Sequence, residues 1–340
     1  RPFSYTPPSG FKKLNTFNLP DSTIEDGSKY FNTVLYTGTG AIRSVTGVGF
    51  QPDWVWGKAR NAAYHSNLFD SVRGVGKTLY SSVTNVELSD AASLTSFDSD
   101  GFSTGADPSA GINYSGTTYV AWNWKAGGTA VSNGDGSITS TVSANPTAGF
   151  SVITFTGNGT AGATIGHGLG AVPKFIVVKN RTYAVNWRVY HASLGATKFL
   201  SLNLGNAVGT SSLEWNNTTP TSSVITVGTS DNINRNTDDI VMYAFAEVEG
   251  YSKFGSYTGN GSTDGTFVYT GFRPSFVMIK RTDSTANWYI YDTTRGTTNA
   301  VTPFLNANTA DAEQSFGAYD FLSNGFKNRQ TNVYFNASGG

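Results

Sequence analysis

The sequence of 340 residues contains no cysteine, which excludes disulfide bonds and thiolate-bound zinc as supports of the fold. Its 23 basic and 23 acidic side chains leave no net charge, and no basic stretch could neutralise a run of phosphates. Nucleic acid is therefore not expected as a partner. No apolar run approaches the roughly 18 residues of a membrane-spanning helix, so membrane insertion is not expected either.

Aromatic rings and glycine dominate what is present. The chain carries 22 Phe, 17 Tyr, 7 Trp and 39 Gly, together with abundant Thr, Ser and Asn. Aromatic and β-branched residues favour strands, whereas glycine and asparagine favour tight turns. No segment has the apolar spacing of a helix of three turns. The composition therefore predicts an all-β fold.

A dozen residues occur three times in related form: GFQPDWVWGKAR at 49–60, GAVPKFIVVKNR at 170–181 and GFRPSFVMIKRT at 271–282. Each copy follows an aromatic-Thr-Gly-x-Gly signal, and successive signals are 119 and 102 residues apart. That period is the size of a domain rather than of a solenoid turn. We therefore expect three tandem antiparallel β-sandwich domains of jelly-roll-like form.

The period divides the chain into a connector, three repeats and one linker. The expected segments are 1–29 (extended connector), 30–128 (first repeat), 129–148 (linker), 149–249 (second repeat) and 250–340 (third repeat). Prolines make the connector extended. The linker is rich in Gly and Ser, with one short strand expected at 137–142. The second and third repeats meet without a spacer, so we expect them to be mutually rigid.

Each copy of the repeated dozen predicts one strand at the centre of a sheet. Proline precedes the strand, where its missing N–H costs no ladder bond. A short continuous apolar run follows, which suits a strand buried on both faces. The lysine after this run is expected to return the chain to solvent, at Lys58, Lys179 and Lys280.

The third repeat lacks a segment that the other two contain. The first closes with TYVAWNWKAGG at 118–128, and the second with IVMYAFAEVEG at 240–250. Aligning 113–116 with 336–339 places Gly340 one residue before a third closing strand should begin. A sheet without that strand would expose its core and an unpaired edge. We expect the native polypeptide to continue, in preference to a second chain that supplies the strand.

Short motifs with chemical meaning do not repeat among the units. SVRGVGKT at 71–78 resembles a phosphate-binding loop but has Ser71 where the first glycine belongs. DSDG at 98–101 resembles the start of a calcium loop, but its counterpart LSNG at 322–325 lacks both aspartates. A tight hairpin turn accounts for what the last two share.

Charged residues and histidines give no catalytic or metal-binding pattern. One carboxylate and one guanidinium recur in the third repeat but are lost together in the second, at Asp70 and Arg73, Asp292 and Arg295, and His191 and Leu194. Joint loss is typical of a local salt bridge rather than of a catalytic acid. The histidines, His65, His167 and His191, occupy non-equivalent positions and are interpreted as surface or turn residues. We predict no catalytic residue, no cofactor and no metal site.

The tryptophans divide into repeated and isolated positions. Trp187 and Trp288 match each other after Asn, and we assign such repeated rings to the cores. Trp215 has no counterpart in the third repeat. It is therefore the candidate for an exposed ring that contacts a glycan.

Two long stretches resemble a known family. They are GNGTAGATIGHGLGAVPKFIVVKNR, and the run from EGYSKFGSYTGNG to NWYIYDTTRG; YTPPSGFKKLNTFNLPD with FQPDWVWGKARN is similar to the same family. The family is a repeat domain of tailed-bacteriophage virion proteins, of the tail fibre or tail-associated kind, often found after a SPRY-type domain. The resemblance covers nearly the whole chain and implies a location in the extracellular virion particle. In the family the third unit usually ends in a closing strand with Ala-Phe-Ala-Glu, which this sequence lacks.

The preferred hypothesis is a non-enzymatic structural or adhesive virion protein: a tail fibre, spike or tail-associated component that attaches to host surfaces. Its expected partners are further copies of itself, as a trimer, and other virion proteins. One alternative is a lectin-like module that binds host cell-surface glycan, and another is a capsid decoration or head fibre protein. A glycan-degrading enzyme would need a carboxylate pair, which the repeats do not show.

Overall fold

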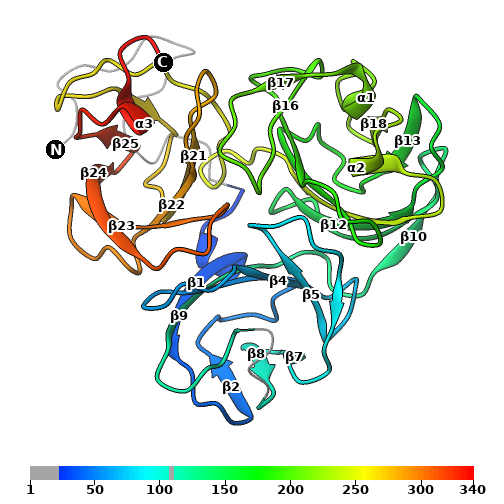
Figure 1. The fold of residues 1–340 in the computed structure, drawn as a ribbon, viewed down its shortest axis with the longest axis horizontal. Helices are drawn as coiled ribbons and strands as arrows, with labels where there is room; N and C mark the ends of the chain where they lie inside the picture. The colour runs from blue at the N-terminus through cyan, green and yellow to red at the C-terminus, as the bar shows by residue number, and fades with distance from the viewer. Residues whose placement is uncertain (1–22, 107–110) are drawn as a thin grey trace, which may run out of the picture.

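Three lobes surround a common centre in the computed structural model, which describes residues 23–106 and 111–340 (Figure 1). The lobes follow one another in chain order and correspond to the three repeats. Their strand ladders are antiparallel, and no helix of the described residues exceeds four residues. The expected all-β class is confirmed. Most of the expected connector, residues 1–22, lies outside the described part.

The first lobe places two sheets against each other. A six-stranded sheet has the order β1-β9-β3-β4-β5-β6, and a three-stranded sheet has the order β2-β8-β7. The turn η2 (Gly27–Lys29) precedes the first strand. The strands are β1 (Phe31–Thr37), β2 (Arg43–Thr46), β3 (Trp54–Ala59), β4 (Asn67–Asp70), β5 (Lys77–Tyr80), β6 (Leu88–Ser89), β7 (Leu94–Asp98), β8 (Gly101–Thr104) and β9 (Thr118–Trp124).

The second lobe repeats the central part of this sheet in the order β10-β11-β12-β19-β14-β15. Two short ladders, β13-β18 and β16-β17, complete it. Its elements are β10 (Val131–Asn133), β11 (Ser140–Asn145), β12 (Phe150–Thr156), β13 (Ala163–Gly166), β14 (Phe175–Asn180), β15 (Arg188–His191), β16 (Lys198–Phe199), β17 (Gly209–Thr210), α1 (Ser212–Trp215), β18 (Val224–Val227), α2 (Asp231–Asn234) and β19 (Asp239–Phe245).

The third lobe has one continuous sheet of order β20-β25-β24-β23-β22-β21. Its strand β21 pairs only with β22, whereas β3 and β14 have partners on both sides. Its elements are β20 (Phe267–Tyr269), β21 (Phe276–Lys280), β22 (Trp288–Asp292), β23 (Val301–Asn306), β24 (Gln314–Leu322), β25 (Gly325–Asn328) and α3 (Val333–Asn336). The expected central strand is therefore confirmed in two repeats and becomes an edge in the third.

The stretch expected to link the first two repeats is part of the second sheet. Residues 129–148 contain β10 and β11, and β11 pairs with β12 from Thr141↔Thr154 to Asn145↔Phe150. The side chains of Ile138 and Val142 are buried in the core of the second lobe. Alternating apolar residues within this Gly- and Ser-rich stretch allow it to form strands. The prediction of a free linker was therefore wrong.

The Thr-Gly-x-Gly signal near the start of each repeat is hydrogen-bonded to a turn near the end of the same repeat. These bonds are called the latch. In the second lobe, the N–H of Gly157 donates to Asp238 O at 2.9 Å and that of Gly159 to Asn234 O at 2.9 Å. A Cβ on Gly157 would lie 2.3 Å from Arg235 O, and Gly159 has a φ of +67°. Both positions therefore require glycine.

The other lobes repeat this latch bond for bond. In the first lobe, the first glycine of the signal donates to Thr117 O and the second to Asn113 O. In the third lobe, the first glycine donates to Gly340 O and the second to Asn336 O. The buried asparagine side chain also accepts a backbone N–H in all three lobes, at Asn113, Asn234 and Asn336. The alignment of residues 113–116 with 336–339 is thereby confirmed.

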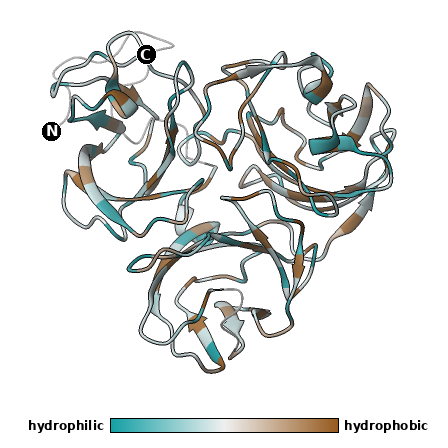
Figure 2. Cartoon of the chain, in the orientation of Figure 1, coloured by the Kyte–Doolittle hydropathy of each residue, from teal (hydrophilic) through white to brown (hydrophobic). Residues whose placement is uncertain are grey.

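A hydrophobic core lies at the centre where the lobes meet. It contains residues of all three repeats, including Trp54, Trp187 and Trp288. Trp54 stacks on Tyr243 of the second repeat with ring centroids 4.4 Å apart. Each lobe also has a core of its own, and Figure 2 shows hydrophobic residues spread over the strands of all three lobes. The repeats are thus packed together as one body rather than strung along a flexible chain.

Candidate functional site: interlocked repeats and an open groove

One lysine from each repeat reaches into the neighbouring repeat. Lys179 Nζ donates to Thr84 O at 3.1 Å, Lys280 Nζ to Gly205 O at 3.1 Å, and Lys58 Nζ to Thr309 O at 2.8 Å. The second repeat thus binds the first, the third binds the second, and the first binds the third. These contacts close a ring of three heterologous junctions.

The expectation that these lysines return to solvent was wrong. The side chains of Lys58 and Lys179 are buried, and Lys280 is half-buried. Burial lowers the pKa of each ammonium group to about 8. Each group also donates to a carbonyl of its own repeat, at 2.8 Å for Lys58 and 2.9 Å for Lys179, which compensates for lost water. Recurrence of lysine at one place in all three copies was the available signal.

Two of the three junctions also carry a buried ionic network. Between the first and second repeats, Arg73 contacts Asp70 at 2.5 Å and Glu87 at 3.0 Å, and Glu87 pairs with Arg181 at 2.9 Å. The hydroxyl of Tyr243 donates to Asp70 at 2.7 Å. The interpretation of Asp70 and Arg73 as a structural salt bridge agrees with this geometry, although the bridge also serves the next repeat.

The same network recurs between the third and first repeats. Arg295 contacts Asp292 at 2.6 Å and Glu313 at 3.2 Å, and Glu313 pairs with Arg60 at 2.8 Å. Here Trp122 takes the place of the tyrosine, and its Nε1 donates to Asp292 at 3.0 Å. In both cases the donor is the fifth residue of a closing strand, β9 or β19.

The junction between the second and third repeats lacks this network. His191 and Leu194 occupy the places of the carboxylate and the guanidinium, and Arg281 pairs with Asp283 within its own repeat at 2.7 Å. The lysine contact is joined here by the indole of Trp288, whose Nε1 donates to Ser201 O at 2.9 Å. Two main-chain bonds also cross the junction, from Val208 N to Thr282 O at 2.8 Å and from Ala286 N to Gly205 O at 2.9 Å. Among the described residues, this junction is the one of the three without an arginine–carboxylate ion pair that joins its two repeats.

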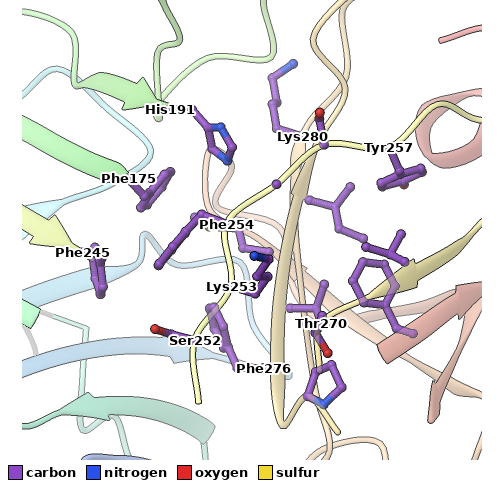
Figure 3. Close-up of a pocket in the computed structure, with 18 of the residues that line it drawn as sticks. Phe175, His191, Phe245, Ser252, Lys253, Phe254, Tyr257, Thr270, Phe276 and Lys280 are labelled. Atoms are coloured by element: carbon purple, nitrogen blue, oxygen red, sulfur yellow. The ribbon is translucent and has the colours of Figure 1, made fainter. Parts of the chain in front are cut away.

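A groove of about 1060 Å³ opens at this junction. Figure 3 shows its lining: Phe175, His191 and Phe245 from the second repeat on one side, and Phe276 of β21 with the coil that carries Lys253 and Phe254 on the other. Phe254 stacks on Phe175 with ring centroids 5.8 Å apart. The groove is the candidate functional site of the described chain.

The groove occupies the place that a closing strand fills in the other lobes. β9 lies between β1 and β3, and β19 lies between β12 and β14. In the third lobe the corresponding flanks are the coil 250–258 and β21, and no strand of the described residues lies between them. The sequence predicted this gap from internal alignment alone.

The side chains of β21 are less buried than those of β3 and β14, which have a strand on both sides. Trp54 and Trp56 of β3 are 1% and 2% exposed, and Phe175 and Val177 of β14 are 8% and 1% exposed. Their counterparts Phe276 and Met278 in β21 are only half-buried. An apolar strand edge that is partly open to solvent can pair with a further strand, and this edge is the feature of the site that indicates a binding partner.

His191 is one of the polar groups that line the groove. Its Nδ1 accepts the backbone N–H of Ser193 at 3.2 Å, and its ring meets the edge of Phe175. Burial lowers the pKa of this imidazole. A neutral imidazole held through Nδ1 presents Nε2 as a donor.

The motifs of the sequence take structural roles. DSDG forms the tight hairpin between β7 and β8, with Asp98 opposite Gly101, and Leu322 opposes Gly325 in the same way. Residues 71–76 connect β4 to β5 and contain the buried Arg73, so the loop that resembles a phosphate site is filled by an ion pair.

Trp215 does not lie on the surface. It is 1% exposed at the end of α1, and its ring packs edge-on against Tyr190 in the core of the second lobe. The expected exposed glycan contact at this residue was therefore wrong, because α1 buries Glu214 and Trp215 and leaves Leu213 exposed. Trp187 and Trp288 are buried as expected.

The histidines divide between surface and core. His65 is exposed, whereas His167 is fully buried in the connection between β13 and β14, so the surface interpretation fails at His167. Residues 23–106 and 111–340 contain no group of three or more His, Asp or Glu placed to hold a metal ion. No helix within the same residues is both long and apolar enough to cross a membrane.

Comparison with known proteins gives one match. A family model described as a domain of unknown function, DUF7483, matches residues 26–340. No curated protein and no solved structure matches the chain. Because the model spans all three repeats and the ring that they form, the chain belongs to the DUF7483 family.

Proposed function

We propose that the chain is a non-enzymatic structural and adhesive component of a bacteriophage virion, of the tail fibre, spike or tail-associated kind. The observation that carries this proposal is the closed ring of three interlocked repeats, in which each repeat holds the next through a buried lysine. Buried charged side chains such as Lys58, Lys179 and Arg73 take part in joining the repeats. Such a body suits a part that must keep its shape outside the cell.

The long resemblance to phage virion repeats supports the same proposal. Motifs such as GAVPKFIVVKNR and NWYIYDTTRG, on which it rests, lie in the structure at the junctions between repeats. They form the β14 and β22 regions that carry Lys179 and Trp288. The residues that define the resemblance are thus those that build the ring.

Labelling of particles tests the proposal directly. Antibodies raised against the purified chain, applied with gold to phage particles of the natural source, should decorate the tail or its fibres. Labelling of the capsid would favour the decoration or head fibre alternative. Particles that carry no label, while the chain is present in the infected lysate, would contradict a virion role.

Self-association and adhesion need separate measurements. The lysine-linked ring is complete within one chain, so a trimer of chains would use the outer faces of the lobes. Light scattering that gives a concentration-independent monomer mass would count against self-association. An adhesive role predicts that the purified chain, added in excess, slows adsorption of the phage to its host.

A further inference from the structure

We propose that the groove of the third lobe is a strand-acceptor site, which binds one extended segment of seven residues between the coil 250–258 and β21. The segment enters beside Gly340 and completes the sheet as β9 and β19 do in the other lobes. This inference concerns the assembly of the fold and stands independently of the virion role.

The mouth of the groove is already shaped for such a segment. Gly259 N donates to Gly340 O at 2.8 Å, as Gly38 N donates to Thr117 O at 2.7 Å and Gly157 N to Asp238 O at 2.9 Å. Thr117 and Asp238 lead directly into β9 and β19. A segment that starts at the carbonyl of Gly340 therefore points into the groove in the same direction.

The edge of β21 supplies the main-chain partners. Thr293 N donates to Ser275 O, so the odd-numbered residues of this strand pair with β22. The N–H groups of Met278 and Lys280 consequently point the other way, into the groove. In the second lobe the equivalent edge of β14 is bonded to β19, as shown by Arg181 N donating to Asp239 O at 2.8 Å.

The two filled lobes define the register. Position 7 of the closing strand lies opposite Trp54 in β3 and Phe175 in β14, and position 5 lies opposite Trp56 and Val177. Transferred to the third lobe, positions 7, 5 and 3 of the bound segment lie opposite Phe276, Met278 and Lys280 of β21. The segment is antiparallel to β21, which is the usual form of strand addition.

The chemistry of the segment follows from what each face must meet. Positions 3, 5 and 7 of β9 and β19 pack in or against the shared centre, as Val120, Trp122, Trp124, Val241, Tyr243 and Phe245. The even positions pack in the core of their own lobe or face its sheet. The segment is therefore apolar on both faces, with rings at positions 5 and 7.

His191 specifies position 5 further. In the first and second lobes, the residue at position 5 of the closing strand donates to a carboxylate of the preceding repeat in the ring. Trp122 donates to Asp292, and Tyr243 donates to Asp70. His191 stands at the same place for the third lobe. We assign it the role of contacting position 5, where a tyrosine hydroxyl can accept from Nε2.

The test joins a strand to the chain. One variant carries DIVMYAF, the sequence of β19, after Gly340. Its control carries IDMVAYF, in which the first six residues exchange faces and the Phe stays at position 7. Amide hydrogen exchange is followed at Met278 and Lys280, with Ile279, already paired to β22, as the internal reference. We expect exchange at Met278 and Lys280 to slow at least about tenfold for DIVMYAF, together with a higher Tm.

Three outcomes would overturn the proposal. Equal slowing by both extensions would show that any apolar tail covers the groove. Unchanged exchange in a folded DIVMYAF variant would show that the groove takes no strand. Protection that appears only with dimer formation in light scattering would assign the groove to a second copy rather than to a segment entering beside Gly340.

Discussion

Trp122 of the first repeat donates its indole N–H to Asp292 of the third repeat at 3.0 Å, across 170 residues of sequence. This bond joins the first repeat to the last. Together with the lysine of each repeat, it makes the three units a closed ring, with the groove at the junction of the second and third repeats. The integrity of the ring can be tested at its buried charges.

Replacing Asp70 with Asn should destabilise the protein strongly. The change leaves the fully buried Arg73 without its nearest carboxylate, and breaking a buried pair in this way costs about 3–5 kcal/mol. Urea denaturation measures the loss. Asp283→Asn removes the carboxylate of an exposed pair and should cost less than about 1 kcal/mol. Equal effects of the two changes would refute a special role for the junction network.

Raising the pH from 8 to 10 should increase the stability of the protein. Burial lowers the pKa of Lys58, Lys179 and Lys280 from 10.5 to about 8. In this window the unfolded chain therefore binds more protons than the folded chain, and the free energy of unfolding rises with pH. The window ends near pH 10, because burial raises the pKa of tyrosines such as Tyr243. Above that pH the folded chain holds the tyrosine protons that the unfolded chain loses, so the free energy of unfolding falls with pH.

Denaturation curves at pH 8, 9 and 10 check this dependence. Lys179→Met removes one of the three groups and should reduce the slope by about a third, since each group contributes in the same direction. Lys29→Met, a change at an exposed lysine, should leave the slope unchanged. A slope that persists in the Lys179→Met variant would mean that other groups produce it.

Adding a methyl group at Gly157 should disrupt the latch of the second lobe. The new Cβ would lie 2.3 Å from Arg235 O, and the backbone must move to admit it, at about 1–3 kcal/mol. Gly134→Ala is the matched control, because a Cβ there meets no atom within 4 Å. Thermal unfolding should separate the two variants by several degrees. Similar Tm values would show that the latch tolerates a side chain.

Trp215→Ala should act on stability and leave any glycan affinity unchanged. Removal of a large ring that is 1% exposed creates a cavity and costs about 3–5 kcal/mol. Leu213→Ala lies on the same helix at a side chain that is 56% exposed and should change stability by less than about 0.5 kcal/mol. If the Trp215→Ala variant had the same free energy of unfolding as the wild type, the assignment of Trp215 to the core would be mistaken.

The sequence by itself determined the repeats, the strand class and the gap in the third sheet. These follow from local rules: aromatic and β-branched runs form strands, Thr-Gly-x-Gly forms a turn, and internal alignment reveals an omitted segment. The same rules treated Lys58 as a surface residue and Trp215 as an isolated ring. Both assignments depend on what lies across a junction or beneath a helix, which no local pattern contains.

Tertiary structure decided how the repeats meet. Lys58 is buried because Thr309, 251 residues away, places a carbonyl over it, and Asp70 is shared because Tyr243 reaches it from another lobe. Such contacts arise from closure of the ring, a property of three packed units rather than of any one of them. The sequence thus located the open groove, and only the packed ring showed that His191, Phe175 and β21 form its walls.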